Sequence, residues 1–220
     1  MLGARTAAWA KSGSPTPAYG GLCFTAEADN SSVQLTAVGS APAVTLVKSF
    51  DGVNWEAYTV GEVIDLPSVG YSVYLAAGEG GNETFGLSAS AAGSSYPAYH
   101  QFVINGRVAA SGDITSIRRF DLEQTTLSPY CYYSMFQDCT GLTSAPELPA
   151  TTLAGSCYGS MFSGCTNLSL IQVHFTAWGT QTSGWVSNVK STGTFYKLSS
   201  LPEEYDTSRI PTGWTVVNID

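Results

Sequence analysis

The sequence predicts a mainly β protein in which an N-terminal antiparallel β-sandwich is followed by a short solenoid with a C-terminal cap. An internal repeat predicts the solenoid: TTLSPYCYYSMFQDCTGL at 125–142 returns as TTLAGSCYGSMFSGCTNL at 151–168, with 11 of 18 aligned residues identical. This 26-residue period lies within the range of leucine-rich repeats, whose coils stack apolar rungs on one another. Short runs of alternating apolar and polar residues before the repeat predict the sandwich.

The composition is that of a turn-rich β protein with few charges. Of the 220 residues, 44% are apolar and 12% are charged, about half of the usual charged share. The net charge of −8 argues against a nucleic-acid partner, because a phosphate-binding groove needs clustered Lys and Arg. We interpret the basic pair Arg118 and Arg119 as a solvated edge. No apolar run is long enough to cross a bilayer, so we expect no membrane insertion.

Residues 1–20 are interpreted as an N-terminal arm. This segment is rich in Ala, Gly, Ser and Pro, and no apolar face continues through it, so it should not fold alone. An ordered arm needs a surface to lie against, and we expect Trp9 to anchor it in a larger assembly. The alternative is an end held only by lattice contacts. The arm has no continuous apolar core like that of a secretory signal, so we expect a protein kept in the cytoplasm or packaged there.

Residues 21–100 are predicted to form the β-sandwich. The runs LCFTAEA, SVQLTAVG, AVTLVKSF, WEAYTVG and YSVYLAAG are short and separated by turn signals, as in antiparallel sandwiches. Asp51-Gly52 predicts a hairpin between two of these runs, and Asn105-Gly106 predicts another between HQFVI and RVAAS. The Gly- and Ser-rich segments 78–86 and 88–98 are expected to be long loops.

Residues 101–220 are predicted to be the repeat domain with its cap. Two coils cannot bury their open ends, so we expect a degenerate coil at 117–124 to cover one end and the segment after 170 to cover the other. Each coil should carry a helical or 3₁₀ turn and then a short strand, near 142–147 and 168–173. Beyond these strands the array should stop. The cap should contain a short helix at 182–190, a strand at 193–197 and a terminal strand at 208–218 with Trp214 buried.

Four of the five cysteines lie in the repeat, with the spacing C-x7-C used twice. This spacing is unlike that of zinc sites, so no metal is expected. Coils in register would stack Cys131 over Cys157 and Cys139 over Cys165. Such residues can be small buried hydrophobes, and the pattern leaves open whether they are free thiols or inter-coil disulfides.

The pattern MFxxCTxLTxAPELPATTLAxxCYxxMFxxCTxL resembles the BspA-like leucine-rich repeats found in surface proteins of gut Bacteroidetes and in phages that infect them. FTAEADNSSVQLTAVGS, SFDGVNWEAYTVG and LPEEYDTSRIPTGWTVVN are similar to parts that accompany this repeat, so the resemblance covers about residues 22–218. It implies adhesion and recognition, and it supplies no catalytic residues. This chain departs from typical members in having two clear coils.

No catalytic constellation is evident. His100 and His174 lie in separate predicted domains, and no known nucleophile, metal or phosphate motif appears. We therefore expect no enzyme and no cofactor. The candidate recognition residues are aromatic and could stack on sugar rings; they are Tyr130, Tyr133, Trp178 and Trp185. The alternative, favoured for the two Trp residues, is that they fill the core and the cap.

These observations predict a non-enzymatic structural protein of a phage virion, such as a decoration, head-fibre or tail-associated protein. The arm would contact other virion proteins, and the repeat domain would face a host surface glycan or protein. The alternative is a bacterial cell-surface adhesin or glycan-binding protein. The ligand, the position on the particle and the choice between a monomer and a homo-oligomer stay open.

Overall fold

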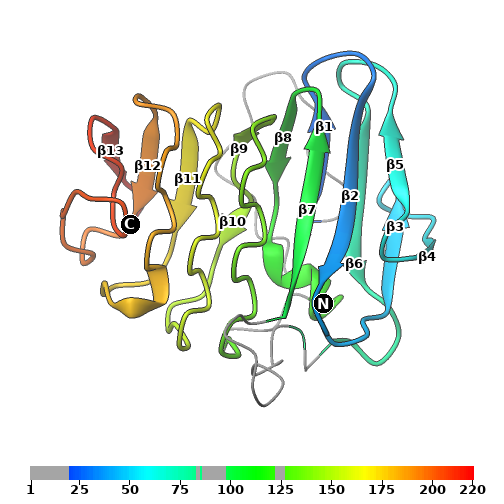
Figure 1. Cartoon of the computed structure of the whole chain (residues 1–220), viewed down its shortest axis with the longest axis horizontal. Helices are drawn as coiled ribbons and strands as arrows, with labels where there is room; N and C mark the ends of the chain where they lie inside the picture. The colour runs from blue at the N-terminus through cyan, green and yellow to red at the C-terminus, as the bar shows by residue number, and fades with distance from the viewer. Residues whose placement is uncertain (1–19, 83–84, 86–97, 122–126) are drawn as a thin grey trace.

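The computed structural model describes residues 20–82, 85, 98–121 and 127–220 (Figure 1). This part of the chain is mainly β, as predicted, with several sheets and almost no helix. Its helical elements are two short 3₁₀ helices, η1 (Ile114–Ile117) and η2 (Thr180–Thr182). The first eight strands are β1 (Cys23–Ala26), β2 (Ser31–Val38), β3 (Leu46–Ser49), β4 (Glu56–Tyr58), β5 (Val63–Leu66), β6 (Ser72–Ala77), β7 (Tyr99–Asn105) and β8 (Val108–Ser111). The later strands are β9 (Leu142–Ser144), β10 (Glu147–Leu148), β11 (Leu170–Val173), β12 (Thr194–Lys197) and β13 (Thr215–Asn218).

The first eight strands form two sheets with antiparallel pairing. One has the order β4-β3-β6-β1-β8 and continues into β9, which pairs parallel with β8. The other has the order β5-β2-β7. In β2 the apolar residues Val33 and Leu35 are fully buried, whereas Ser32 and Gln34 between them are partly exposed. The alternation in the sequence therefore sets which face of this strand meets the core.

The hairpin predicted at Asp51-Gly52 is confirmed, because β3 and β4 pair antiparallel on either side of it. Gly52 has a φ of 74°, which glycine adopts without steric cost. The carboxylate of Asp51 accepts hydrogen bonds from the N–H groups of Val53 and Asn54, at 2.8 and 2.7 Å. These bonds hold the pKa of Asp51 below its usual value and fix the turn.

The hairpin predicted at Asn105-Gly106 is wrong. β7 pairs with β2 while β8 pairs with β1, so the chain passes from one sheet to the other at this turn. The β1–β2 connection makes the same passage beside it, and the Ser31 hydroxyl accepts a hydrogen bond from the N–H of Arg107. A Cβ on Gly106 would overlap the Ser31 hydroxyl. Glycine is required at this position because the β7–β8 turn packs against the β1–β2 connection.

The domain boundary placed between residues 100 and 101 falls inside β7. Both β7 and β8 complete sheets that begin with N-terminal strands. The last strand of the six-stranded sheet is β9, which pairs with β8 and belongs to the repeat. The N-terminal strands and the repeat are thus joined through backbone hydrogen bonds, and not only through a linker.

The repeat forms a stack of coils in which parallel strands follow one another along the long axis of the molecule (Figure 1). Leu170 of β11 pairs with Thr194 of β12, which pairs in turn with Thr215 of β13. The prediction that the array stops after the second coil is wrong, since two further coils extend the ladder at spacings of 24 and 21 residues. The strand predicted at 193–197 is present as β12. Of the strand predicted at 208–218, Thr215–Asn218 is present as β13, and Trp214 is buried as expected.

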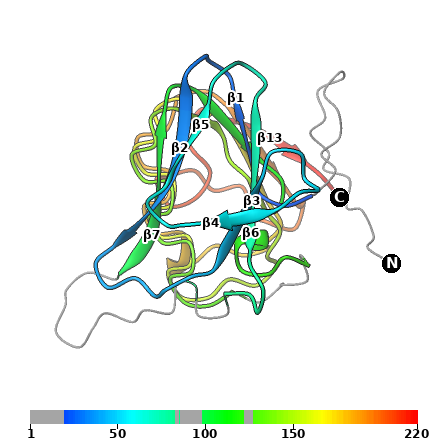
Figure 2. The same ribbon diagram turned by 90° about the vertical axis from the view of Figure 1, so that its right-hand side faces the viewer.

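The side of each coil opposite the strands, where a helical or 3₁₀ turn was predicted, is a chain of tight turns closed by bonds between residues three apart, and its described residues contain no α-helix. In the first coil, Tyr132, Ser134 and Phe136 donate their N–H groups to carbonyls of the second coil, at 2.9–3.0 Å. The intervening N–H groups close turns within the coil, as Met135 does onto the Tyr132 carbonyl. The segment 182–190 repeats this arrangement in the third coil, so the helix expected there is absent from it. Figure 2 shows the coils lying behind one another.

One hydrophobic core runs through both halves of the described chain. Its centre is a column of aromatic rings: Phe102 stacks on Phe136 at 5.1 Å, and Phe136 stacks on Phe162 at 5.6 Å. Phe24 of β1 extends the column at one end, and Trp185 of the third coil extends it at the other. The residues that recur in the sequence repeat are therefore the layers of this core.

All five cysteines are free thiols, and all are buried. The Cys139 thiol donates to the Phe102 carbonyl at 3.0 Å, and the Cys165 thiol makes the same bond to the Phe136 carbonyl at 2.9 Å. Burial raises the pKa of Cys139 and of Cys157 to about 12. The repeat cysteines thus act as small core residues.

Candidate functional site

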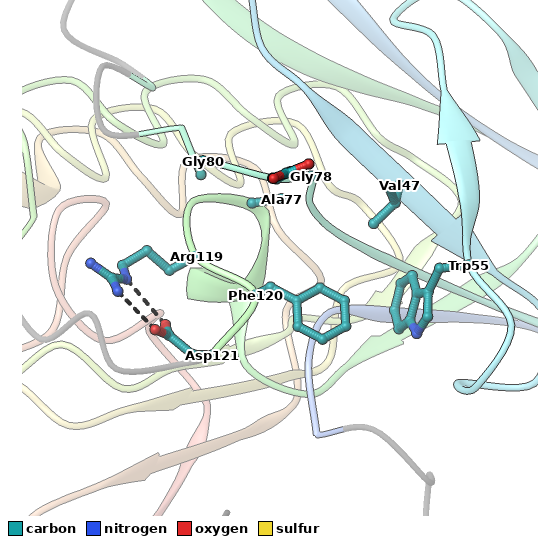
Figure 3. Close-up of a pocket in the computed structure, with 10 residues that line it drawn as sticks. Val47, Trp55, Ala77, Gly78, Gly80, Arg119, Phe120 and Asp121 are labelled. Atoms are coloured by element: carbon teal, nitrogen blue, oxygen red, sulfur yellow. Dashed lines mark hydrogen bonds and ion pairs between the residues drawn. The ribbon is translucent and has the colours of Figure 1, made fainter.

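The described part of the chain contains an open groove of about 610 Å³ on the N-terminal half (Figure 3). Its walls come from four segments that are distant in the sequence: β3, the approach to β4, the turn after β6, and the residues that follow η1. The lining residues are Val47, Trp55, Ala77, Gly78, Glu79, Gly80, Gly81, Arg119, Phe120 and Asp121.

Two aromatic rings form one end of the groove. Trp55 and Phe120 meet edge to face, with ring centroids 5.0 Å apart and an interplanar angle of 72°. The Phe120 side chain is well exposed for a residue of its size, at 43%. Val47 and Trp55 rest on a small second core formed by Cys23, Tyr74 and Ala76 on the outer face of the six-stranded sheet. This second core therefore supports the aromatic end of the groove.

A paired charge forms the other end (Figure 3). Arg119 donates from Nε and from Nη2 to the two carboxylate oxygens of Asp121, at 3.1 and 2.7 Å. Both side chains are about two-fifths exposed. The two side chains form a bidentate ion pair at this end of the groove.

A glycine-rich turn lies between the two ends. The Gly81 N–H donates to the Gly78 carbonyl at 3.1 Å, and Gly80 has a φ of 84°, as in a type II turn. A Cβ on Gly78 would lie 2.6 Å from the Thr45 side chain. Glycine is thus required at Gly78 for space and favoured at Gly80 by its backbone conformation.

Asn82 holds the walls of the groove together. Its side-chain oxygen accepts the Thr45 N–H at 2.8 Å, and its amide nitrogen donates to the carbonyls of Thr45 at 3.0 Å and of Ile117 at 2.8 Å. Its own N–H donates to the Arg118 carbonyl. Asn82 is buried, and it fixes the glycine turn relative to both β3 and η1. It is a positioning residue for Arg119 and Phe120.

The sequence does not reveal this groove because its parts are not adjacent in the chain. In the sequence, Arg119 stands in a basic pair and Trp55 in a predicted strand. Asn82 lies in a Gly-rich segment, and nothing in the sequence marks it as buried. Nothing in the spacing of the four segments predicts that they meet.

The structure brings two of the predicted recognition residues together. Tyr130 and Tyr133 are partly buried and meet edge to face at 5.8 Å, and Tyr133 also contacts the ring of Tyr99 at 5.6 Å. The Tyr133 ring lies over Gly159, where an added Cβ would be 3.0 Å away. This contact explains why the second coil has Gly159 at the position of Tyr133.

The other candidates lie elsewhere. Trp185 is fully buried, and its indole N–H donates to the Arg209 carbonyl, so it is a core residue and its assignment to a recognition surface is wrong. Trp178 is partly buried, packs against Phe175 and donates to the Pro202 carbonyl. Trp9 lies outside the described residues.

No catalytic group stands out among the described residues. His100 is buried, and desolvation lowers its pKa to about 4. His174 contacts Glu147 at 3.1 Å on a different part of the molecule. No three His, Cys, Asp or Glu side chains of the described segments cluster in a way that could hold a metal ion. The same segments contain no helix with the length and apolar character needed to span a membrane.

In comparisons with known proteins, no family model, no curated protein and no solved structure matches this chain. The stack of coils and the groove are therefore the observations from which a function can be inferred.

Proposed function

We propose that this protein is a non-enzymatic structural protein of a phage virion, such as a decoration, head-fibre or tail-associated protein. Residues 1–20 attach it to other virion proteins. In this proposal the two N-terminal sheets are a β-sandwich that acts as a spacer, and the stack of coils is a leucine-rich-repeat-like solenoid that faces outward. The resemblance of the repeat to BspA-like proteins of bacteria and phages supports the assignment.

The observation that carries the proposal is the continuous core. The aromatic column and the β8–β9 pairing join the N-terminal sheets to the coils as one body. Because the two halves share one core, the coils stay at a fixed distance from the N-terminal sheets. A spacer that displays a recognition surface needs this rigidity. A catalytic function receives no comparable support, because the buried thiols and His100 are desolvated and no known catalytic motif is evident in the sequence.

The location is tested by mass spectrometry of purified virions. We expect the protein to be present in stoichiometric amounts in particles purified through a density gradient. Its complete absence from particles would refute the proposal.

The role of the arm is tested by deletion of residues 1–18. We expect the shortened protein to stay folded and soluble, because its described core begins after this segment, and to be lost from particles. A chain with Trp9→Ala alone is the matched variant and should incorporate less well. If the deletion unfolds the protein, the arm is part of the core and the attachment role is wrong.

A second candidate is a bacterial cell-surface adhesin or glycan-binding protein, because the repeat also resembles those of surface proteins of gut Bacteroidetes. Genomic neighbourhood separates the two candidates. Capsid and tail genes beside this gene favour the virion protein, whereas export and polysaccharide-use genes favour the adhesin.

A further inference from the structure

We propose that the open edge of β13 binds the basic N-terminal segment, residues 1–19, of a second copy of this chain as an added strand. This inference rests on the proposed function, because that function requires the arm to leave its own chain and attach to another protein. It deepens that function by naming the partner. The arm of one copy joins the last coil of the next, so that copies link head to tail.

The backbone of β13 is unpaired on one side. β13 is the last strand of the parallel ladder and lies at one end of the molecule (Figure 1). The N–H groups of Thr215 and Ile219 donate to carbonyls in and just before β12, at 2.9 and 3.0 Å. Alternate residues of a strand face opposite neighbours, so the backbone groups of Val216 and Asn218 point away from β12. In the part of the chain that the structure describes, no strand pairs with that side of β13.

The apolar row that ends at this edge is incompletely covered. Ile171 of β11 and Phe195 of β12 are fully buried, because a neighbouring strand lies on either side of each. Val216 pairs with Phe195 and continues the same row, but it is only partly buried. A further strand on β13 would bury the Val216 side chain, as the coils bury the earlier members of its row.

β13 lacks the side chains that keep an edge strand from pairing. Natural edge strands are often blocked by a charged residue, a proline or a bulge. The sequence of β13 is TVVN, which contains no charge and no proline. Its pairing with β12 runs through four consecutive residues without a register shift. The edge is therefore suited to the addition of a strand from another chain.

The end of the molecule around β13 is acidic. Asp220 follows β13 by two residues and is exposed, and the Glu203 side chain is 49% exposed. The carboxylates at this end outnumber the cations; the carboxylates are Glu203, Glu204, Asp206 and Asp220, and the cations are Lys197 and Arg209. Pairing of two β13 edges would bring two acidic ends together, and like charges repel. A basic strand is the better occupant.

Residues 1–19 supply such a strand. They contain Arg5 and Lys11 and no Asp or Glu, whereas the whole chain has a net charge of −8. Trp9 is the one large apolar residue between the two cations, and we expect its ring to cover Val216. Residues 12–19 connect this stretch to the described chain, and a segment of that length can span about 26 Å. The arm can therefore reach a neighbouring copy.

The first test is cross-linking between full-length chains that each carry one added cysteine. One chain carries Ala10→Cys in the arm, and a second chain with a different affinity tag carries Val217→Cys on β13. The natural cysteines are buried and should not compete. We expect a short thiol-reactive cross-linker to join the two chains. Val103→Cys is the matched control, because Val103 is 40% exposed on β7, and it should give no cross-link above background.

The second test is sedimentation velocity of the natural chain. We expect species larger than a monomer that grow with protein concentration and shrink at high salt. Val216→Pro removes an outward N–H and no bond to β12, so it should weaken association by up to about tenfold. If this variant does not fold, Arg5→Ala combined with Lys11→Ala should weaken association and leaves the described chain unchanged. Arg107→Ala, at an exposed cation that pairs with Glu27, is the control and should associate normally.

Three results would each overturn the proposal: a natural chain that stays monomeric at every concentration, equal cross-linking at Val103→Cys and Val217→Cys, or a cross-link that forms only within one chain carrying both Ala10→Cys and Val217→Cys. The last result would assign the arm to its own β13. Failure of this proposal is distinct from failure of the virion role. Self-association is measured on free protein, and the virion role is measured on particles.

Discussion

His100 shows at the scale of one residue how burial changes the titration of a side chain. Its ring stacks on Phe85 at 4.9 Å, and its Nδ1 atom has no hydrogen-bond partner among the described residues. Because the ring is desolvated, the folded state favours the neutral form, and the pKa falls from 6.5 to about 4. A histidine in this setting lowers the stability of the protein in acid.

His100 makes the stability of the protein depend on pH. The unfolded chain takes up a proton near pH 6.5 and the folded chain only near pH 4, so the free energy of unfolding should fall as the pH is lowered through this window. The loss should reach about 3 kcal/mol by pH 4. Urea unfolding at several pH values should show this loss in the natural chain and a smaller one in His100→Phe. Equal pH dependence in both chains would contradict the assignment.

At the scale of the coil, backbone conformation is conserved where side chains are not. Every fourth residue of the turn side has a positive φ: 58° at Tyr130, 51° at Ser134 and 59° at Asp138 in the first coil. The equivalent residues of the next coils are Ser156, Ser160, Gly164, Gly184 and Asn188, and all of them have positive φ. Gly, Asn and Asp tolerate this conformation best, so their recurrence has a backbone cause.

Gly184 isolates this effect, because a Cβ there would meet its nearest atom at 3.7 Å and would find room. Gly184→Ala should lower the free energy of unfolding by about 1 kcal/mol from the left-handed conformation alone. Gly184→Asn should cost less, since Asn188 already adopts this conformation in the same coil. Ser183→Ala, at an exposed neighbour with a negative φ, is the control in chemical denaturation. Equal losses in the Ala and Asn variants would show that the backbone is not the cause.

The residues that stack from coil to coil explain which parts of the fold the sequence predicts. The first two coils are visible because their layers repeat the same side chains, such as Met135 and Met161. The third coil was missed because Trp185 replaces the methionine, and only the backbone pattern persists. The turn at Asn105 predicted a reversal but not the sheet that its second strand joins. The groove was beyond prediction, because its walls meet only after the two sheets and η1 have packed.

At the scale of the whole molecule, the shared core predicts one cooperative unfolding transition. Circular dichroism, fluorescence and calorimetry should report the same midpoint, although two domains were expected from the sequence. Phe136→Ala, in the middle of the aromatic column, should cost about 3–5 kcal/mol and shift the whole transition downward. Two separate transitions, with only one of them shifted, would show that the halves fold independently.

The 26-residue register also makes the protein extensible. In the described part of the chain, the second coil bonds to the first and to the third through N–H groups and carbonyls that recur at equivalent positions. Duplication of the 26 codons for residues 130–155 would therefore insert one more layer and leave both ends unchanged. Each copy would move the last strand about 4.8 Å farther from the first, the spacing of neighbouring strands. The length of the protein is thus set by the number of coils. The distance between the groove and β13 can change in equal steps without a new fold.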